Sequence, residues 1–215
     1  MNSIICKIAD KDSDLESIAK CRIESFPNSL SSKLGIKYVK KLLTFYFTNN
    51  NFLIYLSNEE ECVGFVTGMV PESDFICSTR EAIDLTYKDI LKGLLKKPWL
   101  IFHPIILSNL NLVIELIRNK ISLSKQDETR MPARTPEELK GSVGLIDIAV
   151  SPKHQGKGYS SLLLKAFEDK CYENGLNKMH LSVKPENNKA IQSYLRNGWV
   201  IFEKWPHQLT FTKNK

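Results

Sequence analysis

The feature that most constrains the fold is a short turn with two glycines between an apolar strand pattern and a helical pattern. The stretch "IDIAVSPKHQGKGYSS" (146–161) places Gly156 and Gly158 just before the predicted helix. Glycines let the backbone approach a ligand closely, and a helix N-terminus attracts negative charge. The pattern is typical of a turn that binds a pyrophosphate group, although the same glycines also suit a tight turn without a ligand.

Two common phosphate-binding motifs do not fit this turn. A P-loop requires a lysine after its last glycine and then Ser or Thr, whereas Lys157 precedes Gly158 here. A dinucleotide fingerprint requires a third glycine where the chain has Ser161. The turn must therefore belong to another class of strand-to-helix connection.

Composition limits the partners without choosing one. The 215 residues suit one domain, and the net charge of +6 favours anionic ligands or surfaces. Basic residues form no stripe interleaved with aromatics, so we expect no nucleic acid. The five cysteines are widely spaced and form no metal-binding pattern with the histidines, so we expect reduced thiols, no metal and a cytoplasmic protein. The apolar run in "MNSIICKIADKD" is too short for a signal peptide.

Hydrophobic periodicity predicts alternating strands and helices. We expect strands at 4–8, 52–57, 62–70, 143–150, 178–183, 199–205 and 209–213, and helices at 12–26, 31–47, 158–175 and 187–198. Residues 71–141 do not continue this alternation of strands and helices. We expect them to form a helical and loop insertion within a single domain that spans 1–215.

The insertion contains the apolar stretch "WLIFHPIIL" (99–107), which is interrupted by Pro104. A membrane-spanning helix needs roughly 20 mostly apolar residues, so this stretch is too short to cross a bilayer. A buried helical pair is the leading expectation. A helix that lies on a membrane surface stays open, because basic residues flank the apolar part on both sides: Lys88, Lys92, Lys96 and Lys97 before it, and Arg118 and Lys120 after it.

The last third of the chain resembles the GCN5-related N-acetyltransferase (GNAT) superfamily. The family's pyrophosphate motif is Q/R-x-x-G-x-G/A, and Gln155, Gly158 and Ser160 stand at its positions. Ser160 departs from the usual glycine or alanine, but it is small, and its hydroxyl could add a contact to a phosphate. The likeness is specific from about 143 to 205 and does not extend to the insertion.

A second motif of the family lies downstream of the first. It consists of an asparagine, an alanine, a tyrosine four residues later, and a glycine followed by an aromatic residue. The chain has Asn187, Ala190, Tyr194, Gly198 and Trp199 at these positions. Trp199 replaces the usual phenylalanine, which is a mild change.

The resemblance implies an α/β (α+β) fold with a mixed, splayed, mostly antiparallel sheet of about seven strands flanked by helices. The insertion would lie between the third and fourth strands. Acetyl-CoA would lie where the strand ending at Val150 parts from the strand ending at Val183. The implied cofactor-binding residues are Ile148, Ala149, Val150, Gln155, Gly156, Lys157, Gly158, Tyr159, Ser160 and Asn187.

The resemblance also implies an acetyl transfer by direct attack of an amine on the thioester. Tyr194 would be the general acid, although a packing role is the alternative for a tyrosine on a helix that faces a sheet. Asp147 is a candidate base because an apolar strand can raise the pKa of a carboxylate, but it could instead cap a neighbouring loop. Glu24 or a chain of water molecules are further candidates for the base.

The acceptor site would include Glu24, Phe26 and Ser29. An aromatic face with hydroxyl groups suits a small-molecule amine, such as an amino sugar. A protein or peptide acceptor and an inactive acyl-CoA-binding module stay open as alternatives. A peripheral contact between the insertion and a membrane or lipid carrier stays open as well, as does a homodimer.

Overall fold

The computed structural model describes residues 4–10, 12–44, 51–59, 61–70, 86, 89–108, 139 and 141–215. Within them the chain forms one seven-stranded sheet in the order β1-β2-β3-β4-β5-β7-β6. The strands are β1 (Ile5–Ile8), β2 (Phe52–Asn58), β3 (Glu61–Met69), β4 (Val143–Val150), β5 (Lys178–Val183), β6 (Val200–Trp205) and β7 (Gln208–Asn214). Among these pairings β4 with β5 is parallel and the others are antiparallel, which confirms the expected fold class.

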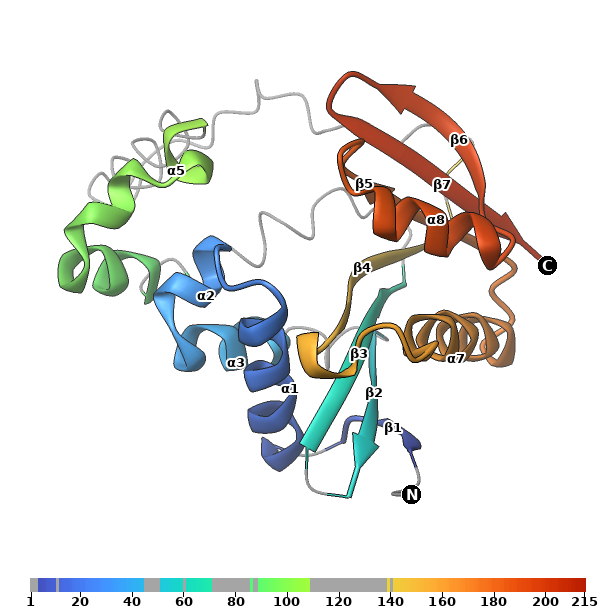
Figure 1. The fold of residues 1–215 in the computed structure, drawn as a ribbon, viewed down its shortest axis with the longest axis horizontal. Coiled ribbons are helices and arrows are strands. Elements are labelled where there is room, and N and C mark those ends of the chain that lie inside the picture. The colour runs from blue at the N-terminus through green and yellow to red at the C-terminus, as the bar shows by residue number, and fades with distance from the viewer. Residues whose placement is uncertain are drawn as a thin grey trace, which may run out of the picture.

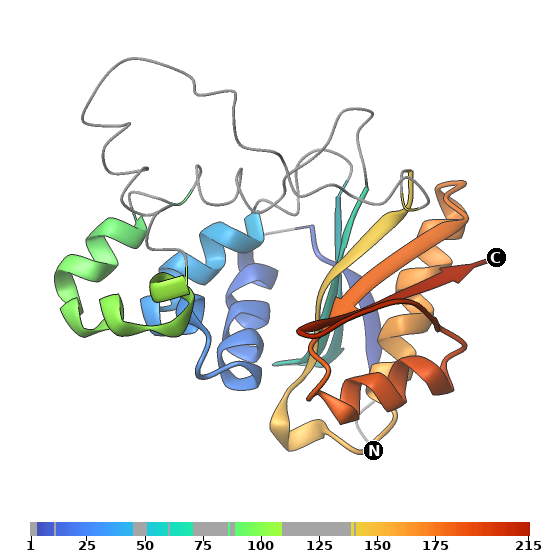
Figure 2. The same ribbon diagram turned by 90° about the horizontal axis from the view of Figure 1, so that it is seen from above.

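Helices cover both faces of the sheet (Figures 1 and 2). On one face lie α1 (Asp12–Ser25) and α3 (Ile36–Thr44), which enclose a core with the inward side chains of β2 and β3. On the other face lie α7 (Tyr159–Glu173) and α8 (Asn188–Arg196), which share a second core with β4, β5 and β7. The chain therefore buries the sheet from both sides.

The expected single helix over 31–47 is wrong. The structure has two helices there, α2 (Leu30–Leu34) and α3, with Gly35 between them at φ +103°. That φ lies outside the helical range and is one that glycine adopts without strain. The amide of Gly35 donates to the carbonyls of Ser31 and Ser32, which ends α2. Residues 45–47 lie outside the described residues.

Strands β4 and β5 part soon after they begin to pair. Their ladder joins Val143–Leu145 to Met179–Leu181 and goes no further. In the ladder with β3, Thr67 pairs with Asp147 and Gly68 with Leu145, so Ile146 is the extra residue of a β-bulge. The bulge bends β4 where it leaves β5, and it confirms the expected splay.

The described part of the insertion consists of Thr86 and residues 89–108. Residues 89–96 are helical, and they are followed by a 3₁₀ turn, η2 (Pro98–Phe102), and by α5 (Pro104–Ser108). The segment lies against α2 and α3 (Figure 1). Asp89 pairs with Lys41 at 2.6 Å, and the ammonium of Lys97 donates to the carbonyl of Lys33 at 2.7 Å.

The expectation of a buried helical pair is wrong for this described part. Leu100 and Ile106 are buried, but Leu95, Trp99 and Phe102 are largely exposed to solvent. Among the described residues, no helix is both long and apolar enough to cross a membrane. The assignment of 71–141 as an insertion in a single domain stays a prediction, because most of that range lies outside the described residues.

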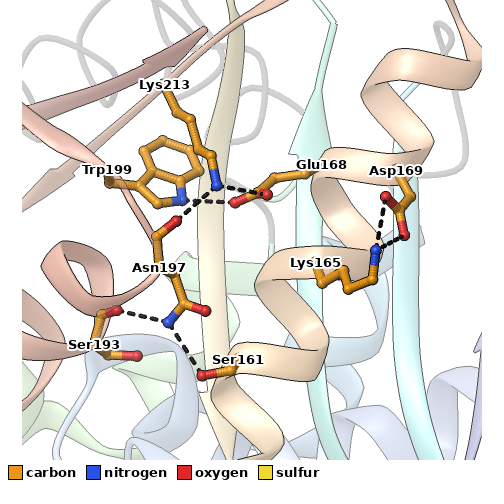
Figure 3. A network of polar contacts seen from close by, with 8 residues as sticks. All are labelled: Ser161, Lys165, Glu168, Asp169, Ser193, Asn197, Trp199 and Lys213. Atoms are coloured by element: carbon orange, nitrogen blue, oxygen red, sulfur yellow. Dashed lines mark hydrogen bonds and ion pairs between the residues drawn. The ribbon is translucent and has the colours of Figure 1, made fainter. Parts of the chain in front are cut away.

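A buried polar network connects α7 to the C-terminal strands (Figure 3). The carboxylate of Glu168 accepts a hydrogen bond from the indole of Trp199 at 2.9 Å and one from Lys213 at 2.8 Å. Lys213 also donates to the carbonyl of Asn197 at 2.7 Å. Because both oxygens of a nearly buried carboxylate have donors, its charge is compensated inside the core.

We predict that Trp199→Phe lowers the free energy of unfolding by about 1–3 kcal/mol, because one oxygen of Glu168 loses its donor inside the core. Trp205→Phe is the matched control, since Trp205 is 52% exposed and should change stability by less than about 0.5 kcal/mol. Urea unfolding with an unchanged m-value measures both. Equal losses would show that the indole hydrogen bond contributes nothing.

Candidate active site

The glycine turn forms an open cradle at the start of α7. Both Gly156 and Gly158 have φ of +80°, where a side chain would be strained, and a Cβ added to either would meet no atom within 4 Å. Gly158 is also the N-cap residue of α7. The turn therefore leaves exposed backbone and open space for a ligand at the N-terminus of α7, a helix of 15 residues.

A cavity of about 680 Å³ extends from this cradle along the end of β4 to α8. Its volume falls within the usual range for a small-molecule or cofactor site, about 300–1,000 Å³. Of the predicted cofactor-binding residues, it is lined by Ile148, Ala149, Val150, Gln155, Gly156, Gly158, Tyr159, Ser160 and Asn187. Lys157 is the exception, because it is exposed and does not line the cavity.

The sequence analysis missed the basic side chains that line the same cavity. Lys189 and Arg196 both lie on α8 and both contribute to the cavity wall. They are seven residues apart, which puts them near one face of a helix, and that spacing was the available signal. Two cations beside an open helix N-terminus favour a polyanionic ligand.

A second cavity of about 510 Å³ lies in the gap between β4 and β5. It is lined by Asp147, Ser182, Lys184 and Glu186 together with apolar residues of β4 and β5. The two cavities share Phe26, Ile148, Asn187 and Tyr194. A ligand in one cavity and a ligand in the other would therefore meet beside Tyr194.

Tyr194 is buried where the two cavities meet. Its ring packs against Phe211, at 5.6 Å between ring centroids, and against Trp199 at 6.4 Å. Burial, with a smaller contribution from the charge of Asp147, raises the pKa of Tyr194 to about 12. The phenol is therefore protonated and able to donate a hydrogen bond at any physiological pH.

Asp147 is held by an arginine that the sequence analysis did not single out. The Nε of Arg22 in α1 lies 2.6 Å from Oδ2 of Asp147, and both side chains are mostly buried. The same guanidinium donates to the hydroxyl of Ser31 at 2.6 Å and lies 5.7 Å from the centre of the Phe26 ring. Burial raises the pKa of Asp147, while the charge of Arg22 acts in the opposite direction.

The three predicted acceptor residues have different positions. Phe26 lines both cavities. Ser29 caps α2, since its hydroxyl accepts from the amide of Ser32 at 3.2 Å. Glu24 accepts a hydrogen bond from Ser151 at 3.2 Å and lines a separate hollow of about 590 Å³ between α1 and the β2–β3 turn. The structure thus brings Phe26 to Tyr194 but does not bring Glu24 there.

Hydrogen bonds between side chains connect α8 to the first turn of α7. Ser193 donates to the hydroxyl of Ser160 at 3.3 Å. The amide of Asn197 donates to Ser161 at 3.1 Å and to the carbonyl of Ser193 at 2.7 Å (Figure 3). These contacts fix the helix that carries Tyr194 relative to the cradle.

The described residues contain no cluster of three or more His, Cys, Asp or Glu side chains suited to a metal ion. His180, which lies beside the gap in β5, is turned to Ser142 instead, with 2.6 Å between Nδ1 and the hydroxyl. Burial lowers the pKa of His180, so its ring is neutral near physiological pH.

Part of the chain is similar to a known protein family. Residues 121–199 match the sequence profile of the acetyltransferase (GNAT) family. No curated protein matches the chain in a sequence search.

Solved structures share the fold over nearly the whole chain. PaiA N-acetyltransferase from Thermoplasma acidophilum, in complex with coenzyme A, is 13% identical, with a TM-score of 0.56 and 99% of each chain covered. YncA from Salmonella typhimurium, solved with its cofactor acetyl-CoA, is 12% identical, with a TM-score of 0.56 and coverage of 99% of this chain and 94% of that one. A ribosomal-protein-alanine N-acetyltransferase from Brucella melitensis is 12% identical, with a TM-score of 0.57 and coverage of 98% and 99%.

At these identities the solved structures establish the fold, and the profile match covers β4, α7, β5 and α8, which build the candidate site. The chain is therefore similar to the GNAT family of acetyltransferases over residues 121–199, and it shares the fold of solved acetyltransferases over nearly its whole length.

Proposed function

We propose that this protein transfers an acetyl group from acetyl-CoA to a primary amine of a small molecule. The observation that carries the proposal is the meeting of two cavities beside Tyr194. One cavity begins at the glycine cradle, and the other has a polar wall that includes Asp147. A donor and an acceptor bound in these two cavities would have their reacting groups next to each other, which is the main requirement for direct transfer.

The larger cavity fits the donor. The backbone amides of the 155–160 turn and the N-terminus of α7 would bind the pyrophosphate, and Lys189 and Arg196 would add positive charge. Beyond Leu145, β4 has no ladder partner on the side of β5 among the described residues. The main chain of Ile148 and the amide of Val150 would therefore be available to the pantetheine arm, while the carbonyl of Val150 accepts from the side chain of Gln155 at 3.2 Å. Two of the structurally similar proteins contain coenzyme A or acetyl-CoA, which supports this assignment.

Two groups of the chain would act on the thioester. A backbone amide near Val150 would stabilise negative charge on the carbonyl oxygen during the attack. The phenol of Tyr194 would donate a hydrogen bond to the departing sulfur. A phenol with a pKa of about 12 is a weaker acid than a thiol with a pKa of about 8.5, so transfer of its proton to the thiolate is unfavourable by itself. Full transfer would therefore require that Tyr194 receives a second proton at the same time.

Asp147 is the proposed acceptor of the amine's proton, directly or through a water molecule. It lines the second cavity, and its Oδ2 accepts a hydrogen bond from the Nε of Arg22. Arg22 would thus orient the carboxylate and leave the other oxygen for the acceptor. The raised pKa of Asp147 makes it a better base than an ordinary aspartate.

The wall of the second cavity favours a polar, compact acceptor. Ser182 and Glu186 offer hydrogen-bond acceptors beside Phe26, whose ring could stack on the apolar face of a sugar. An amino sugar is therefore the first acceptor to test. A peptide N-terminus is the second, because one structurally similar protein is a ribosomal-protein-alanine N-acetyltransferase.

We predict that Gly158→Trp abolishes the binding of acetyl-CoA, measured by calorimetric titration. Gly175→Trp is the matched control, because Gly175 also has a positive φ and open space around it but lies at the other end of α7. Both variants carry the same backbone strain, so only blocking of the cradle distinguishes them. Equal loss of binding in both would contradict the assignment of the cradle.

We predict that Tyr194→Phe lowers kcat by roughly a hundred-fold or more while the Kd of acetyl-CoA changes little. The variant keeps the ring that packs on Phe211 and removes only the hydroxyl. Release of free CoA with amino sugars, other small amines and an alanyl peptide measures the rate and tests the acceptor class. Binding of acetyl-CoA without turnover of any amine would favour the inactive module instead.

We predict that kcat/KM falls as the pH is lowered through the raised pKa of Asp147, because the protonated carboxyl cannot act as a base. Asp147→Asn should remove this acid limb and lower the rate, with thermal unfolding as the check on folding. Glu24→Gln is the control carboxylate, since it lies in the separate hollow. An acid limb lost in Glu24→Gln but kept in Asp147→Asn would assign the base to Glu24.

A further inference from the structure

The described part of the insertion has one side docked on the protein and one side turned away from it. On the docked side, Leu100 and Ile106 are buried, and His103 lies 3.0 Å from the carbonyl of Asn28. The segment lies beyond α2 and α3, at the end of the molecule opposite to β6 and β7 (Figures 1 and 2). Its outer side is therefore free of the sheet and its helices.

Large apolar side chains of this segment are exposed. Leu95 is 84% exposed, Trp99 is 63% exposed and Phe102 is 73% exposed. Trp99 and Phe102 are three residues apart in a 3₁₀ turn, a spacing that puts both side chains on the same side. We call Leu95, Trp99 and Phe102 the insertion face. Single exposed leucines are common, but several large exposed residues in one short segment indicate an interaction surface.

The charge around the insertion face is positive. Lys92 and Lys96 are exposed, and the ammonium of Lys97 is held at the carbonyl of Lys33. Asp89 is the only acidic residue in the sequence from 89 to 108, and Lys41 already neutralises it at 2.6 Å. The apolar side chains are therefore bordered by cations without free acidic partners in the same segment.

We propose that the insertion face binds an anionic lipid surface as a peripheral contact. Aromatic and aliphatic side chains enter the interface of a bilayer, while neighbouring lysines bind the acidic headgroups. A second copy of the chain is a poorer occupant, because it would bring the same lysines against one another. The contact does not depend on the proposed acetyl transfer, so the two can fail separately.

Tryptophan fluorescence tests the proposal on the full chain. In a Trp205→Phe background, Trp99 is the exposed one of the two remaining tryptophans, because Trp199 is 1% exposed. Vesicles that contain phosphatidylglycerol should shift the emission to the blue and sediment the protein, and added salt should weaken the binding. Pure phosphatidylcholine vesicles should do neither.

Variants at the two ends of the molecule locate the contact. Phe102→Ser should weaken binding roughly ten-fold or more, and Lys96→Gln about five-fold. Phe202→Ser and Lys204→Gln are the matched controls on β6, where both side chains are exposed, and they should leave the affinity unchanged. No binding to phosphatidylglycerol vesicles, or equal losses in the β6 variants, would overturn the proposal. A dimer that Phe102→Ser dissociates would overturn it as well, because a second copy would then cover the face.

Discussion

The short ladder between β4 and β5 is the constraint on which the candidate site depends. Two parallel strands that stayed paired would close the sheet and leave no space beside Tyr194. The ladder instead ends at Leu145 and Leu181, and the bulge at Ile146 turns β4 away. The second cavity lies in the resulting gap, the first adjoins it beside Ile148 and Tyr194, and β4 has no ladder partner on that side among the described residues. The sheet therefore lacks backbone hydrogen bonds between β4 and β5 beyond Leu145, and the amide groups of a ligand could form hydrogen bonds with β4 in their place.

The same gap brings a carboxylate, a guanidinium and a phenol into a largely apolar wedge. An isolated charge there would be costly, and Asp147 is tolerated because Arg22 reaches it from α1. Arg22 also holds Ser31 and lies over Phe26, so it orders the loop between α1 and α2. One arginine therefore connects the proposed base to the wall of the proposed acceptor cavity.

The sequence was informative where a local rule decides the structure. The glycine turn was predictable because positive φ angles favour glycine, and most strands and helices followed from hydrophobic periodicity. The break at Gly35 was missed because the apolar pattern continues through it. Arg22 and Asp147 are 125 positions apart, and no local signal connects them. Trp199 was recognised as part of a motif, but its bond to Glu168 depends on how α7 packs on the C-terminal strands, which periodicity does not reveal.

The hydrogen bonds from Ser193 and Asn197 to the first turn of α7 have a mechanical consequence. They link the first turn of α7, which follows the glycine cradle, to the helix of Tyr194, because Ser160 and Ser161 lie in that turn and Ser193 precedes the tyrosine. A displacement of the cradle would displace the phenol by a similar amount. A change at Ser193 or Asn197 would therefore disturb the proposed donor site and the proposed general acid together, although neither residue is proposed to contact the reacting atoms.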